Sequence, residues 1–108
     1  MSKTFGVNAP TLAFAARIAE LHPQLPAPNL GTNPYMPNEL SLCLASVADV
    51  EAWREALHVP VDQMHFGAHG NGGLVVEFEA AVEGVVVRAF VLFRSDELAK
   101  AIKEADTA

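Results

Sequence analysis

Two histidines, His65 and His69, are the residues whose types and spacing most suggest chemistry. On a helix, a four-residue spacing would bring both imidazoles to one face, where they could chelate zinc. Gly67 and Gly70 interrupt this segment, however, and the surrounding pattern predicts a strand. Because a strand advances about 3.3 Å per residue, the two side chains would stand about 13 Å apart. We therefore expect no metal ion to be shared by this pair.

A cluster of His65 with two glutamates and an arginine is a stronger candidate site. The predicted strand register places His65 opposite Glu79 and diagonal to Glu77, and it places Arg88 opposite Glu79. A histidine beside carboxylates can bind a ligand or move a proton, although a half-exposed histidine paired with a carboxylate is the more common arrangement. We treat the four residues as candidate ligand-binding residues. No catalytic residue, metal ligand or cofactor is assigned.

The other chemistry-bearing residues have simpler explanations. Cys43, the only cysteine, has no predicted basic neighbour or helix N-terminus to activate its thiol. The glycine-rich segment 70–73 is followed by no helix, so it predicts a hairpin loop and not a phosphate cradle. His22 and His58 fall in the last turns of predicted helices, and Trp53 lies on an apolar helical stripe. These readings make an enzyme less expected than a binding protein.

Length and composition limit the classes of function. The chain has 108 residues, of which 51% are hydrophobic, and a formal net charge of −6. One domain fits this length, and its core is large enough to fold alone. The acidic balance argues against nucleic acid, and no apolar run reaches the roughly twenty residues of a membrane span. A cytoplasmic location is expected, because the sequence has neither a signal-peptide core nor a disulfide framework.

Proline, glycine and hydrophobic periodicity divide this single domain into four parts. They are a tail and helix over 1–22, a proline-rich connector over 23–38, a βαβββ core over 39–94, and a helix and tail over 95–108. Thr11 is the predicted N-cap of the first helix. The connector holds five of the seven prolines, which predicts an extended segment without a regular element. The order α–β–α–β–β–β–α predicts an α+β fold whose sheet includes a three-stranded antiparallel meander.

Two hairpin loops, at residues 71–73 and 83–84, set the predicted register of the meander. The first loop pairs Phe66 with Phe78, so that apolar residues meet apolar residues across the strands. Both loops together place one apolar set on a shared face: Met64, Phe66, Ala68, Leu74, Val76, Phe78, Val87, Ala89, Val91 and Phe93. This face is expected to contact the helices.

The opposite face of the predicted sheet carries Phe90 and Leu92 among polar residues. Large apolar side chains on such a face need a cover, which could be the first helix, a ligand or a second subunit. The first helix is apolar on more than one side, so its Phe14 and Ile18 are further candidate interface residues. These features predict a non-enzymatic binding or regulatory module that acts through protein–protein contacts, either as a homodimer or with a protein partner.

Two resemblances add to these expectations. The segment Ser-Val-Ala-Asp-Val-Glu-Ala-Trp-Arg-Glu-Ala-Leu over 46–57, with the Gly- and Val-rich hairpins after it, resembles small uncharacterised actinobacterial proteins of mobile-element or orphan type, which implies no activity. The element order over 39–94 is similar to one module of the vicinal-oxygen-chelate (glyoxalase and bleomycin-resistance) fold. In that family two modules form a cup that binds metal and ligand, so a single module would dimerise. This resemblance implies the alternative function, a cup-shaped small-ligand or metal-binding protein with His65, Glu77 and Glu79 on its inner face.

Overall fold

The computed structural model describes residues 3–69 and 73–94. Within these ranges the chain forms two helices and a five-stranded sheet, with short 3-10 turns before the first helix and before the third strand. The helices are α1 (Ala9–Leu21) and α2 (Val47–Ala56), and the strands are β1 (Asn29–Thr32), β2 (Glu39–Cys43), β3 (Met64–His69), β4 (Gly73–Val82) and β5 (Val85–Arg94). This architecture confirms the α+β class. The helix predicted over 95–108 lies outside the described residues.

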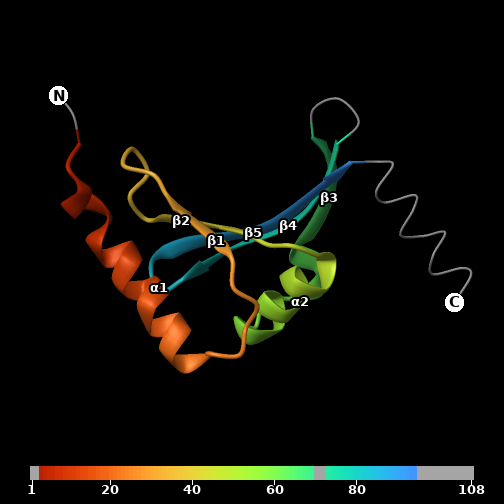
Figure 1. Ribbon diagram of the computed structural model, residues 1–108, viewed down its shortest axis with the longest axis horizontal. Helices are drawn as coiled ribbons and strands as arrows, with labels where there is room; N and C mark the ends of the chain where they lie inside the picture. Colours follow the sequence, from red (N-terminus) through yellow and green to blue (C-terminus); the bar gives the residue numbers. More distant parts are fainter. Residues whose placement is uncertain (1–2, 70–72, 95–108) are drawn as a thin grey trace, which may run out of the picture.

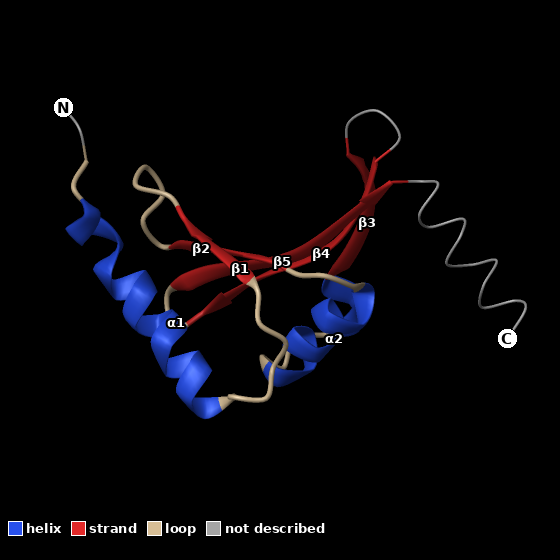
Figure 2. Cartoon of the chain, in the orientation of Figure 1, coloured by secondary structure: helices blue, strands red, loops and turns tan. Residues whose placement is uncertain are grey.

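The sheet is mixed and has the strand order β1-β2-β5-β4-β3. The predicted meander is present as β3, β4 and β5, which pair antiparallel in sequence order. β2 pairs with β5 in parallel, so the chain leaves the sheet through α2 before it returns, as a parallel pair requires. Both helices lie on the same side of the sheet (Figures 1 and 2). The other side is the open face, so named because no described helix covers it.

Helix α2 forms where the capping pattern and the apolar stripe agree. Ser46 is the N-cap, and its hydroxyl accepts a hydrogen bond from the Asp49 backbone N–H at 3.1 Å. Val50 and Trp53 point into the core and are buried. The helix ends at Ala56, so His58 lies beyond it and not in its last turn as predicted. His58 has a left-handed φ of 57° that turns the chain away.

The start of α1 differs from the prediction. The helix begins at Ala9, so Pro10 lies in its first turn, where a missing N–H costs nothing. Thr11 is therefore inside the helix and not its N-cap. Its hydroxyl donates to the Pro37 carbonyl oxygen, and the Asn8 side-chain amide donates to the Asn33 carbonyl oxygen at 3.1 Å. These two buried polar groups attach α1 to the loop that precedes β2.

The proline-rich connector contains a strand that the sequence did not predict. Residues Asn29–Thr32 form β1, which pairs antiparallel with β2 along the edge of the sheet. The prolines do not prevent this pairing, because Pro28 precedes the strand and Pro34 follows it. A strand this short fits between them, and an edge position tolerates prolines nearby.

The two hairpin predictions have different outcomes. The β4–β5 register is confirmed, with Val76 opposite Val91 and a two-residue turn whose Glu83 and Gly84 both have positive φ. The β3–β4 register is shifted by two residues from the prediction, because the paired His69 and Gly73 leave residues 70–72 between the strands. Those three residues lie outside the described ranges. A two-residue shift keeps every side chain on its predicted face, so the like-with-like criterion could not detect it.

The core lies between the helices and the covered face of the sheet. Its most buried large side chains come from α1, β2, α2, β4 and β5: Phe14, Leu40, Leu42, Val50, Phe78 and Val87. Phe66 was expected on this face, and its register position does face the helix side. Its side chain is nevertheless 76% exposed, because β3 is the edge strand, and it lines an open groove with Val47 at the start of α2.

Candidate functional site

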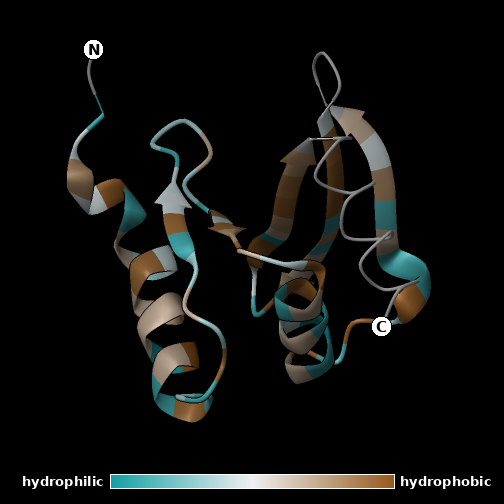
Figure 3. Cartoon of the chain, turned by 45° about the vertical axis from the view of Figure 1, so that its right-hand side comes forward, coloured by the Kyte–Doolittle hydropathy of each residue, from teal (hydrophilic) through white to brown (hydrophobic). Residues whose placement is uncertain are grey.

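The open face is the first candidate site. Its ten most informative side chains come from four neighbouring strands: Ser41, Cys43, His65, Val75, Glu77, Glu79, Val86, Arg88, Phe90 and Leu92. Each of them is half-buried or exposed, in contrast to the buried residues that alternate with them on β2, β4 and β5. Figure 3 shows hydrophobic colour along the long strands of the sheet. Four of the ten side chains, Val75, Val86, Phe90 and Leu92, are large and apolar, so the open face is more apolar than a solvent-facing sheet needs to be.

Arg88 is the centre of the polar part of the open face. Its Nε and Nη2 atoms donate to the same Glu77 carboxylate oxygen, Oε2, at 2.9 and 2.7 Å. Its guanidinium carbon lies 5.0 Å from the centroid of the Phe90 ring, within the range of a cation–π contact. The prediction placed Glu79 opposite Arg88, which the register confirms. The ion pair forms with the diagonal Glu77 instead.

The structure brings His65 to a different partner from the one predicted. The shifted β3–β4 register places His65 opposite Glu77, whereas Glu79 was expected. His65 is exposed on the edge strand, and the Glu77 carboxylate beside it is already bound by Arg88. Among residues 3–69 and 73–94, no group of three or more histidine, cysteine, aspartate or glutamate side chains is arranged to hold a metal ion. The geometry thus gives an arginine–glutamate pair with His65 and Glu79 at its margins.

The four predicted interface residues lie on opposite sides of the sheet. Leu92 is 44% exposed and Phe90 is half-buried, both on the open face. Phe14 and Ile18 are only 1% and 7% exposed, because α1 directs them into the chain's own core against β2. They are therefore not available to a partner. The same placement removes the first helix as a cover for Phe90 and Leu92.

Cys43 also lies on the open face, at the end of β2. It is half-buried and opposite Phe90 in the parallel β2–β5 register. The neighbouring Leu44 backbone N–H donates to the Phe90 carbonyl oxygen at 2.8 Å, which extends the pairing past the strand end. The free thiol is consequently a natural reporter of whether this part of the face is covered.

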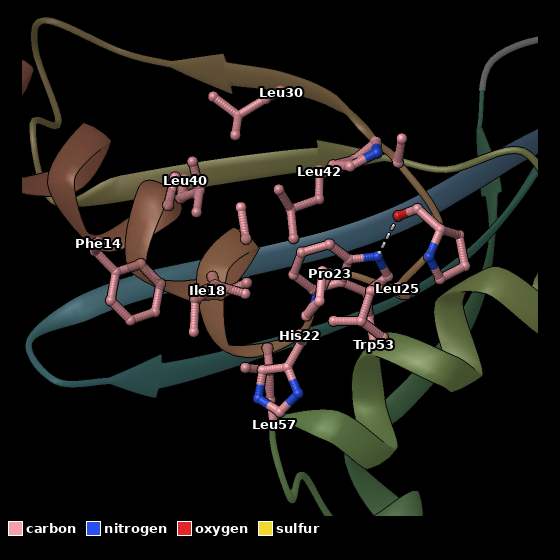
Figure 4. Close-up of a pocket in the computed structure, with 16 residues that line it drawn as sticks. Phe14, Ile18, His22, Pro23, Leu25, Leu30, Leu40, Leu42, Trp53 and Leu57 are labelled. Carbon is pink, nitrogen blue, oxygen red and sulfur yellow. Dashed lines mark hydrogen bonds between the residues drawn. The ribbon is translucent and has the colours of Figure 1, made fainter.

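The second candidate site is a cavity on the helix side of the sheet (Figure 4). It has a volume of about 230 Å³ and lies between α1, the connector, β1, β2 and α2. The Trp53 indole Nε1 donates to the Pro26 carbonyl oxygen at 2.8 Å and so joins α2 to the connector beside it. The apolar stripe of α2 predicts a core position for Trp53, but no sequence pattern predicts the cavity, because β1, which borders it, is itself not predicted.

Fold and site together define an α+β protein with a mixed five-stranded sheet, one covered face and one open face. No helix in the described part of the chain is long and apolar enough to cross a membrane. No family model matches the chain, and neither the curated proteins nor the solved structures contain a match.

Proposed function

We propose that the protein is a non-enzymatic interaction module that forms a homodimer through its open face. The observation that carries this proposal is the position of Phe90 and Leu92, which both described helices leave uncovered. A cytoplasmic setting belongs to the same proposal, and the single free cysteine is compatible with it.

The apolar content of the open face supports burial against another surface. Val75, Phe90 and Leu92 are neighbours on β4 and β5 and form a continuous apolar strip, since Val75 pairs with Leu92 and Phe90 lies two residues before Leu92 on the same face of β5. An antiparallel sheet that stays in water usually alternates apolar and polar residues cleanly between its faces. A contiguous apolar strip rimmed by charges is typical of an interaction site.

The charges of the open face favour a second copy as the partner. An interface with two-fold symmetry uses the same patch twice, so the patch must complement itself. The open face carries both signs: Arg88 is 40% exposed in its side chain, and the Glu79 carboxylate stands opposite it on β4. Glu77 takes hydrogen bonds from two of the guanidinium nitrogens, which leaves further donors of the five N–H groups for a carboxylate of the second copy.

The size of the open face is also appropriate for a dimer. Five strands about 4.8 Å apart give a sheet about 24 Å wide, and the ten-residue β4 and β5 are each about 33 Å long. With the shorter strands included, the flat area is on the order of 500–600 Å², and side-chain relief adds to it. This approaches the roughly 800 Å² per partner of a standard interface.

The oligomeric state in solution tests this proposal. Size-exclusion chromatography with light scattering over a micromolar concentration series should give a species of twice the chain mass of 11.5 kDa, that is 2 × 11.5 = 23 kDa. The dimer fraction should increase with concentration, as mass action requires. A monomer at every concentration up to several hundred micromolar would contradict the proposal.

A further inference from the structure

We infer that the cavity between α1, the connector and α2 is a binding site for a small, uncharged, apolar molecule of aromatic or branched aliphatic type. The site is separate from the open face, because it lies on the helix side of the sheet. The inference therefore does not depend on the proposed dimer.

The cavity opens to solvent, since Ala19, Ala27 and Leu30 in its lining are exposed, and it is larger than ordinary packing defects. Protein interiors are close-packed, and voids larger than a water molecule are few in a domain. Here the volume is about 230 Å³, whereas an apolar cavity of about 150 Å³ in another protein holds a benzene ring. The space is therefore sufficient for a substituted ring or a compact bicyclic molecule, and it is too small for a helix or a strand.

The wall that the connector provides is stiff and anchored at both ends. Pro23, Pro26 and Pro28 all line the cavity, and each fixes its own φ angle. At the near end the His22 carbonyl oxygen accepts from the Leu25 N–H at 3.1 Å, and at the far end β1 pairs with β2. The hydrogen bond from Trp53 to Pro26 holds the middle. A wall fixed at three places resists collapse into the cavity, which is the preorganisation that a binding site needs.

The chemistry of the lining defines the ligand class. Its side chains are alanine, leucine, isoleucine, valine, phenylalanine, proline and tryptophan, with one exception. The exception is His22, whose ring Figure 4 places at the side of the cavity away from Leu30. The Trp53 N–H is already used by Pro26, so the indole offers its apolar surface. The lining has no charged side chain, so a charged ligand would lose its hydration without gaining an ion pair in return. A neutral apolar ligand with at most one polar atom near His22 would not have this cost.

Trp53 allows a direct measurement, because it is the only tryptophan in the chain and it lines the cavity. Bromobenzene is a suitable probe, since its ring fits the volume and its heavy atom quenches indole fluorescence on contact. We expect saturable quenching with a Kd of about 0.1–1 mM, which is reasonable for a ligand of seven heavy atoms. Linear quenching without saturation would indicate collisions only and would overturn the inference.

Two alanine-to-leucine substitutions on α1 separate the cavity from the rest of the helix. Ala15 lines the cavity, so Ala15→Leu should fill it and weaken the bromobenzene affinity at least about tenfold. Ala16 is exposed and does not line it, so Ala16→Leu is the matched control and should bind as the unmodified protein does. If Ala15→Leu fails to fold by circular dichroism, Ala19→Leu decides instead, because Ala19 is exposed yet lines the cavity. Equal affinity in the cavity-lining and control variants would overturn the inference.

A side chain from a second copy is the competing occupant of the cavity. In that case the apparent affinity for bromobenzene would fall as the protein concentration and the oligomer fraction increase, and this result would also overturn the inference. We expect an affinity that is independent of protein concentration. A variant that is monomeric because its open face is disrupted should bind bromobenzene with the same affinity as the unmodified protein.

Discussion

Leu92→Asp is expected to convert the homodimer into a monomer. Leu92 lies in the apolar strip of the open face, where the proposed dimer would bury it. An aspartate at this position would place an unpaired carboxylate in the interface, at a cost of about 3–5 kcal/mol, or roughly a hundred- to several-thousandfold in Kd. Light scattering after size-exclusion chromatography measures the loss of the dimer directly.

The matched control for this experiment is Leu21→Asp. Leu21 ends α1 and is 71% exposed, so the same chemical change there tests the alanine-rich helix as the competing interface. Leu21→Asp should remain dimeric. Because both positions are exposed in one copy of the chain, both variants should remain folded, with the circular dichroism spectrum of the unmodified protein. Dissociation by Leu21→Asp and not by Leu92→Asp would move the interface to α1.

Phe78→Ala should cause the largest loss of stability among single substitutions in the sheet. Phe78 is 0% exposed on the covered face of β4, where it belongs to the core with Val50 and Trp53 of α2. Removing a buried phenylalanine side chain costs about 3–5 kcal/mol, because both the transfer free energy and a residual cavity oppose the folded state. Denaturant unfolding followed by circular dichroism gives this change in the free energy of unfolding.

Phe66→Ala is the matched control for Phe78→Ala, and it also tests the β3–β4 register. The predicted register places Phe66 opposite Phe78, with both side chains on the buried face. In the structure Phe66 is opposite Val76 and is 76% exposed. The loss for Phe66→Ala should therefore stay below about 1 kcal/mol. A loss as large as that of Phe78→Ala would support the register expected from the sequence and contradict the one described here.

The sequence predicted the faces of the sheet correctly, and the physical reason is the two-residue period of a strand. Phe90, Leu92, Glu77 and Arg88 are on the predicted face because parity alone decides the side of a strand residue. The predicted partner of His65, Glu79, was wrong because a two-residue shift in register leaves every side chain on the same face of the sheet. Only the position of the β3–β4 loop could have distinguished the two registers.

The parts of the candidate sites that depend on tertiary contacts could not be predicted. Thr11 has the side chain of an N-cap, but its hydroxyl bonds to Pro37, which is distant in sequence. β1 has only four residues between prolines, and it forms because the β2 edge offers it partners. The cavity exists only when this strand, the connector and α2 meet, so no local pattern indicates it.

The reactivity of Cys43 tests the central claim most directly, because this only cysteine lies on the open face opposite Phe90. The measurement is the rate of alkylation by iodoacetamide, followed by mass spectrometry at protein concentrations below and above the midpoint of dimer formation. If the open face is the interface, the rate should follow the monomer fraction and fall as the dimer forms. A dimer that forms while Cys43 reacts at an unchanged rate would contradict the account.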